Sequence, residues 1–233
     1  MVQVNNTPLT VRIKFRKEGG LQYISHLDLV RTMHKIIVRS KLPLWYTEGF
    51  NPKPKMVFAA PLSIGTESKS EYMDLRLTER VPESEVAEAL NKNLTEEMQV
   101  LEVYYPETKL TDLKWFSYTI SITTENGSQE LAKSCEALLN SPNIEIEKKT
   151  KPGEPTKTVN IAPLIRSAAA VFCEGEIVIH SCLSADQSCF LNPEYVVKAL
   201  KKYCGILSSG NLLSERYGIV RECAYLEDMT PFR

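Results

Sequence analysis

The segment TVRIKFRK, residues 10–17, decides how the first half of this chain folds. Its apolar side chains alternate strictly with basic ones, which is the period-2 pattern of a strand with one buried face. Two glycines at 19–20 then end or bend the strand. Ser25 follows with Asp28 three residues later, the spacing of a reciprocal helix cap. The segment therefore predicts a half-buried strand that leads into a capped helix.

The rest of the first half completes a recognisable order of elements. The apolar face of the first helix should run to Pro43, because the residue before proline disfavours the helical conformation. A second helix is expected from Pro82, where proline suits a first turn and nearby acids suit the positive end of the helix dipole. The strands are expected at 56–60, 71–77 and 98–105. This order is β-α-β-β-α-β, the ferredoxin-like arrangement.

The second half repeats this order more loosely after a linker at 106–112. Its second helix begins Pro-Glu-x-x-Val, as the second helix of the first half does. Residues 151–155 indicate a turn, and residues 162–170 fit neither a helix nor a strand clearly. The strands are expected at 116–123, 143–149, 176–183 and 217–226, and the helices at 129–139 and 193–204. We therefore expect an α+β protein of two tandem ferredoxin-like (βαββαβ) domains, residues 1–106 and 107–233.

Composition excludes several classes of protein. Hydrophobic residues make up 43% and charged residues 24% of the 233 residues, so a core can form without metals or disulfides. No stretch approaches the roughly 18 apolar residues of a membrane span, and residues 1–10 lack a secretory signal. None of the six cysteines has Cys-x-x-Cys spacing, so no metal site and no cofactor are expected. These features predict a cytoplasmic protein with reduced thiols and no membrane contact.

Charge is concentrated at one end of the chain. Residues 1–60 carry ten basic and three acidic side chains, a net charge of +7, although the whole chain carries −1. Such asymmetry indicates either a basic binding face or chance clustering on a solvated surface.

The loop from Gly49 to Lys55 is the segment most typical of nucleic-acid binding. Its two prolines stiffen the backbone, Phe50 offers a flat apolar surface, and Lys53 and Lys55 offer positive charge. Aromatic stacking combined with phosphate neutralisation is how single-stranded RNA is held. We therefore predict RNA contacts from Phe50, Asn51, Lys53 and Lys55; the alternative is a structural loop with Phe50 in the core.

Further RNA contacts are predicted from other basic residues. Arg12, Lys14 and Arg16 should lie on the sheet face that the helices leave open, with Tyr72 as an aromatic neighbour and Asp74 as a partner for one of them. A solvated or interdomain face is the alternative. The first helix adds Arg31 and Lys35, which are four residues apart.

Catalytic signals are sparse. His26 is a weak candidate for a general acid or base, although such a histidine more often holds a local turn. His34 lies roughly 80° from it around the helix, so the two do not share one face. His180 and Cys182 share a side of their strand, but no zinc-site spacing accompanies them. The protein is therefore expected to be a binding protein rather than an enzyme.

Three stretches resemble a known family. They are Ser25-His26-Leu27-Asp28, the segment from Leu42-Pro43 to Gly49-Phe50-Asn51-Pro52-x-Pro54, and the segment from Pro61-Leu62 to Gly65, Ser68 and Glu71. These motifs resemble those of a family of unknown function described as radical-SAM-associated, in its stand-alone form. The resemblance implies an accessory protein that partners a radical SAM protein. Together with the basic charge and the Phe50 loop, it leads us to expect that the chain binds or presents an RNA substrate such as tRNA or rRNA. An endoribonuclease-like RNA-processing enzyme and a protein–protein adaptor without RNA contact are the alternatives.

Overall fold

A computed structural model describes residues 7–148 and 156–233. The chain is an α+β protein that divides into two compact units. Unit 1 ends at Leu113 and also takes in Phe232 and Arg233, and unit 2 covers Lys114–Pro231. The segment that the sequence assigned to a linker, 106–112, therefore belongs to unit 1, where it includes the short 3-10 helix η2 (Leu110–Asp112).

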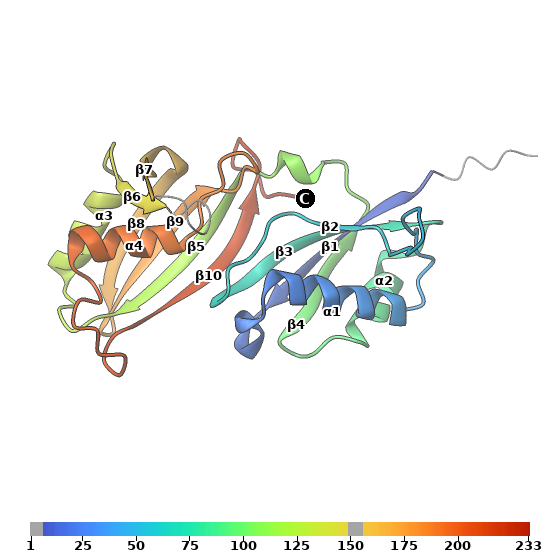
Figure 1. Cartoon of the computed structure of the whole chain (residues 1–233), viewed down its shortest axis with the longest axis horizontal. Coiled ribbons are helices and arrows are strands. Elements are labelled where there is room, and N and C mark those ends of the chain that lie inside the picture. The colour runs from blue at the N-terminus through green and yellow to red at the C-terminus, as the bar shows by residue number, and fades with distance from the viewer. Residues whose placement is uncertain (1–6, 149–155) are drawn as a thin grey trace, which may run out of the picture. The chain divides into compact units, whose positions relative to one another are not determined.

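Unit 1 is a sheet with two α-helices (Figure 1). The elements are β1 (Leu9–Lys17), the 3-10 helix η1 (Gly19–Tyr23), α1 (His26–Arg39), β2 (Met56–Phe58), β3 (Thr66–Leu77), α2 (Glu83–Asn91) and β4 (Met98–Tyr104). The strands are antiparallel neighbours in the order β4-β1-β3-β2, so the first strand of the chain lies inside the sheet.

The core of unit 1 follows the alternation that opens the sequence. Val11, Ile13 and Phe15 are fully buried and pack in one cluster with Met33 of α1 and Val86 of α2. Burying one such side chain contributes about 1.5–3 kcal/mol relative to leaving it exposed. The apolar face of β1 therefore points towards the helices, and the intervening basic side chains point to the opposite face of the sheet.

Helix α1 begins as its sequence predicts. The Ser25 hydroxyl accepts a hydrogen bond from the Asp28 amide at 3.1 Å, and the same hydroxyl donates to the Asp28 carboxylate at 2.7 Å. The cap satisfies one of the amides that an α-helix leaves without an internal partner. This reciprocal contact defines the residue at which α1 begins after η1.

Unit 2 has a similar set of elements. They are β5 (Trp115–Thr123), α3 (Gln129–Leu139), β6 (Glu145–Lys148), β7 (Lys157–Asn160), β8 (Ile165–Cys173), β9 (Glu176–Ser184), α4 (Glu194–Cys204) and β10 (Arg216–Tyr225). The main strands are neighbours in the order β10-β5-β9-β8, and β6 and β7 form a separate antiparallel pair. Residues 162–170 form the 3-10 helix η3 (Ala162–Leu164) and the start of β8, and the predicted turn at 151–155 lies outside the described residues.

Two local signals shape unit 2. Glu174 and Gly175 join β8 to β9 with φ of 52° and 84°, the positive values that a tight two-residue hairpin turn requires. Helix α4 ends at Gly205, whose φ of 68° lets the chain reverse in the left-handed conformation. Within residues 7–148 and 156–233, no helix has the length and apolarity needed to cross a membrane.

Candidate nucleic-acid interface

The loop between α1 and β2 is a short hairpin anchored to the edge of the unit 1 sheet. The Trp45 amide donates to the Arg76 carbonyl of β3 at 2.9 Å, and the Lys55 amide donates back to the Trp45 carbonyl at 2.9 Å. Nearer the tip, the Thr47 amide bonds to the Lys53 carbonyl at 2.9 Å. The Thr47 hydroxyl also accepts from the Lys53 amide at 3.1 Å. These bonds hold residues 48–52 away from the sheet as a defined tip.

Phe50 stands at this tip with its side chain fully exposed, at 111% of the reference area for an exposed residue. Gly49 before it has φ of 122°, a conformation that glycine adopts without strain. Asn51, Lys53 and Lys55 are also exposed, whereas Pro54 is buried. The structure therefore places Phe50 outside the core.

Helix α1 adds basic side chains beside the hairpin. Arg31 and Lys35 are exposed, and Arg31 pairs with Asp28 at 3.2 Å across one turn. Burial lowers the pKa of His34, and the positive charge of Lys53 lowers it further, so the hairpin reaches the flank of α1. We call Arg31, Lys35, Phe50, Asn51, Lys53 and Lys55 the helix–loop surface.

Arg12 does not lie on an exposed basic face, contrary to the prediction. Its side chain is fully buried, and its guanidinium forms two bonds to the Asp74 carboxylate, at 2.7 and 3.0 Å. It also donates to the hydroxyl and the carbonyl of Thr108 at 2.8 and 3.0 Å. A buried cation needs such partners because it has lost its water, so Arg12 is committed to a structural ion pair.

Lys14 and Arg16 are half-buried rather than free on the sheet face. The Lys14 ammonium lies 6.0 Å from the centre of the Tyr72 ring, close enough for a cation–π contact. Arg16 pairs with Glu18 at 3.3 Å and donates to the Glu96 carbonyl at 3.1 Å. This face of the sheet therefore offers fewer free basic groups than its sequence predicts.

His26 packs against an aromatic ring. Its imidazole meets Phe58 edge to face, with ring centres 5.5 Å apart and an interplanar angle of 81°. Its Nδ1 is buried and has no hydrogen-bond partner within the described part of the chain. A general acid or base needs a polar partner within reach of its substrate, whereas this contact fixes the start of α1 against β2.

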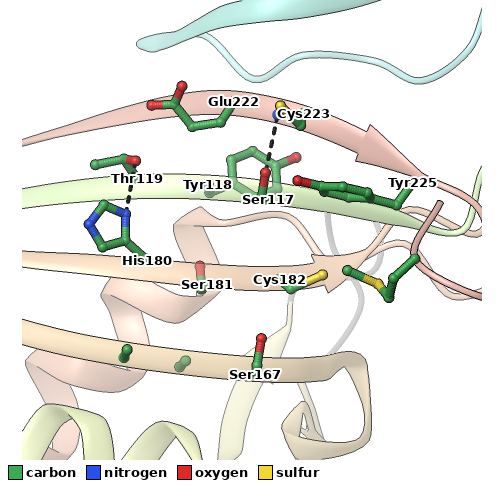
Figure 2. Close-up of a pocket in the computed structure, with 13 residues that line it drawn as sticks. Ser117, Tyr118, Thr119, Ser167, His180, Ser181, Cys182, Glu222, Cys223 and Tyr225 are labelled. Carbon is green, nitrogen blue, oxygen red and sulfur yellow. Dashed lines mark hydrogen bonds between the residues drawn. The ribbon is translucent and has the colours of Figure 1, made fainter. Parts of the chain in front are cut away.

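Sequence reasoning missed an open hollow of about 650 Å³ on the sheet of unit 2. Figure 2 shows its side chains on neighbouring strands, with Thr119 beside His180 and with Ser117, Cys182 and Cys223 further along the strands. The Nδ1 of His180 lies 3.3 Å from the Thr119 hydroxyl. The Cys223 amide donates to the Ser117 hydroxyl at 3.2 Å. The alternation along β9 puts His180 and Cys182 on one side of the strand and could have pointed to the hollow. It does not identify the other strands that line the hollow.

The hollow is lined by hydroxyl and thiol side chains together with His180 and Glu222. Burial raises the pKa of the Cys182 thiol, although the charge of Arg166 opposes the shift, so the thiol keeps its proton. Among residues 7–148 and 156–233, no three His, Cys, Asp or Glu side chains gather as metal ligands. We therefore give the helix–loop surface, with its exposed lysines, priority as the candidate for nucleic-acid binding.

Comparison with solved structures finds 29 similar chains, and three of them are as follows. A chain of a Cbf5-Nop10-Gar1 complex aligns with a TM-score of 0.47 and 9% identity, over 92% of this chain and 48% of that one. A chain of an H/ACA RNP bound to a substrate RNA containing 2′-deoxyuridine aligns with a TM-score of 0.46 and 9% identity, over 91% of this chain and 46% of that one. An unknown protein from Galdieria sulphuraria aligns with a TM-score of 0.27 and 11% identity, over 92% and 99% of the two chains. This chain thus spans about half the length of the first two.

Sequence comparison gives a family. No curated protein matches this chain. The profile of a family described as "Uncharacterized protein conserved in bacteria (DUF2344)" matches residues 10–193, which include the helix–loop surface and the strands that line much of the hollow. This chain therefore belongs to the DUF2344 family of bacterial proteins.

Proposed function

We propose that this protein binds single-stranded RNA through the helix–loop surface of unit 1. The observation that carries the proposal is Phe50, an aromatic side chain held fully exposed at the tip of a hydrogen-bonded hairpin. Exposing a phenylalanine has no benefit for folding, whereas an exposed ring provides a platform for an unpaired base. Lys53 and Lys55 lie within five residues of that ring, where they can neutralise phosphates.

The charges of this surface favour a polyanion. Arg31, Lys35, Lys53 and Lys55 are basic and exposed, and the acidic neighbours in the same two segments are Asp28 and Glu48. Asp28 is already engaged by Arg31 and by the cap of α1. The net positive balance supports phosphate contacts made by the lysines while Phe50 stacks on a base.

We extend the proposal to the fold, as two tandem ferredoxin-like domains with a boundary close to residues 106–113. The support is topological. Once the β6–β7 pair is set aside, each unit has the element order β-α-β-β-α-β, and its fourth, first, third and second strands are neighbours in that order. This element order is the ferredoxin-like motif, and its repetition supports two related domains.

We propose a radical SAM protein as the partner and an RNA as the shared substrate, so that this chain presents RNA without cleaving it. The support is the family resemblance of residues 25–71 together with the exposed aromatic loop. Purification of this protein from its native host should bring a radical SAM protein with it. A purification that recovers other proteins instead contradicts the partnership.

Labelled total RNA tests the RNA proposal. Retention without cleavage supports it, cleavage indicates an endoribonuclease, and neither result indicates an adaptor. The Lys53→Ala/Lys55→Ala double variant should weaken binding and reduce the slope of log affinity against log salt by about two. The matched control is Lys133→Ala/Lys157→Ala, which removes two exposed lysines from unit 2. If both double variants bind RNA as the parent does, with equal thermal stability, the helix–loop surface is not the RNA site.

A further inference from the structure

Phe232 and Arg233, the last two residues of the sequence, lie against the face of the unit 1 sheet that the helices leave open. Phe232 is only 3% exposed. Its ring meets Tyr72 of β3 edge to face, with centres 5.1 Å apart and an interplanar angle of 85°. The Arg12 guanidinium lies 4.7 Å from the centre of the same ring. One aromatic ring thus contacts both a tyrosine and an arginine.

Arg233 makes a different set of contacts beside it. Its guanidinium pairs with the Glu102 carboxylate of β4 at 3.0 Å and lies 5.3 Å from the centre of the Tyr104 ring. The Thr108 hydroxyl donates a hydrogen bond to the Arg233 carbonyl. We call Arg12, Tyr72, Glu102 and Tyr104 the sheet socket, and its occupant is an aromatic ring followed by a group with several N–H donors.

The sheet socket is built by contacts that do not need the occupant. Arg12 is held by Asp74 and Thr108, so its guanidinium keeps its place whether or not Phe232 is present. Tyr72 is paired with Lys14 in the register of β1 and β3, and Tyr104 with Arg12 in the register of β1 and β4. The strand ladders therefore position both rings.

We propose that the sheet socket is a binding site for an unpaired RNA base that carries an exocyclic amino group, and that Phe232 and Arg233 occupy it in the absence of RNA. The base replaces the Phe232 ring against the Arg12 guanidinium and Tyr72, which are the two kinds of surface on which unpaired bases stack. Its amino group donates to Glu102 as the Arg233 guanidinium does, since carboxylates accept from base amino groups. This inference deepens the proposed RNA binding and rests on it.

Charge favours a nucleotide over a peptide at this position. The Lys14 ammonium lies 6.0 Å from the Tyr72 ring, beside the place that the base takes. A phosphate attached to the base gains from Lys14, whereas the arginine of a peptide gains from Glu102 alone. A peptide with an aromatic–arginine pair satisfies Glu102 but not Lys14, and it is tested below as the competing occupant.

The test uses the full chain with Phe232→Ala/Arg233→Ala, which empties the sheet socket. Binding of short labelled oligocytidine, oligoadenosine and oligouridine is measured by fluorescence anisotropy. Cytosine and adenine carry an exocyclic amino group and uracil does not, so the first two oligonucleotides should gain affinity and the third should gain less. A gain of about tenfold corresponds to native residues that occupy the site about nine-tenths of the time.

Two further variants keep the test decisive. Arg233→Ala alone retains the packing of Phe232, so it reports on the site even if the double variant is unstable, and it should give a smaller gain. Glu102→Met keeps the length of the side chain but removes both acceptor oxygens, so the preference for cytosine and adenine over uracil should disappear. Equal gains for all three oligonucleotides contradict the role of Glu102.

The outcomes separate this inference from the proposed function. If the parent binds RNA through Lys53 and Lys55 but both socket variants bind all three oligonucleotides as the parent does, the sheet socket is not a base site and the proposed function stands. If no variant binds RNA, both proposals fail. If the double variant instead binds a labelled Phe-Arg peptide more tightly than any oligonucleotide, the socket is a peptide site.

Discussion

The two units share a strand order but differ on the face that does not carry the core. In unit 1 this face holds large charged and aromatic side chains, with Arg12 bonded to Asp74 beside Tyr72. In unit 2 many of the side chains on it are small, such as Ser117 and Thr119, and they line an open hollow together with His180 and Glu222. The topology requires apolar residues on the helix side only, so the opposite face is free to acquire a separate chemistry in each unit.

The same contrast appears after the first helix of each unit. In unit 1 the chain forms the hairpin with Phe50 at its tip before it enters β2. At the corresponding place in unit 2 it forms the β6–β7 pair before it enters β8. Both insertions leave the order of the main strands unchanged, because connecting segments tolerate change that a packed sheet does not.

The largest effect is expected where unit 1 buries charge. Arg12→Ala leaves the Asp74 carboxylate without its partner and should destabilise the protein by about 3–5 kcal/mol in urea unfolding. Asp74→Asn should destabilise the protein less, because the asparagine amide oxygen still accepts one hydrogen bond from Arg12. If Arg12→Ala is as stable as the parent, the Arg12–Asp74 ion pair does not stabilise the fold. The faces opposite the helices in the two units would then differ less than their contacts indicate.

The second largest effect is expected in the cores of the two units, which should be similarly sensitive to the loss of a buried side chain. Ile13→Ala in β1 and Ile120→Ala in β5 each remove a fully buried side chain from an internal strand. Each should cost about 2–5 kcal/mol, because a cavity remains where the side chain packed. The exposed Leu213→Ala is the control, and it should change stability by less than about 0.5 kcal/mol. If the two substitutions change the free energy of unfolding by very different amounts, the two cores are not equivalent.

Phe50→Ala should have a smaller effect, and on binding alone. Loss of a stacked base costs about 1–3 kcal/mol in RNA affinity. The melting temperature should stay unchanged because the side chain is fully exposed. RNA affinity and thermal unfolding are measured on the same sample, with Leu213→Ala as the exposed apolar control from unit 2. A fall in stability that matches the fall in affinity shows that Phe50 packs rather than binds.

The smallest expected effect is a pH dependence in unit 1. Burial, aided by Lys53, holds the pKa of His34 below its ordinary 6.5, so the unfolded chain takes up this proton first as pH falls. Stability should therefore decrease as pH drops through 6.5 towards the lowered pKa. His34→Gln removes the titrating group, and urea unfolding at pH 7.5 and 5.5 should then show a smaller difference. An unchanged difference assigns the pH dependence to other groups.

The local elements can be read from short stretches of the sequence. The alternation of residues 10–17 identified β1, and the Ser25–Asp28 pair identified the start of α1. The turn composition of 49–55 identified the exposed loop, although Phe50 was equally compatible with a core position. These signals are readable because periodicity and capping act between residues a few positions apart.

Contacts between distant side chains depend on the tertiary structure. Arg12 and Asp74 are separated by 62 residues, and Thr119 and His180 by 61, yet each pair forms a direct contact. The return of Phe232 to Tyr72 likewise has no counterpart in any local pattern. Such contacts depend on strand order and register, which place residues side by side through the backbone ladder and not through their own sequence neighbours. The basic alternation of β1 therefore predicted a strand correctly, while the role of Arg12 emerged only from its partners.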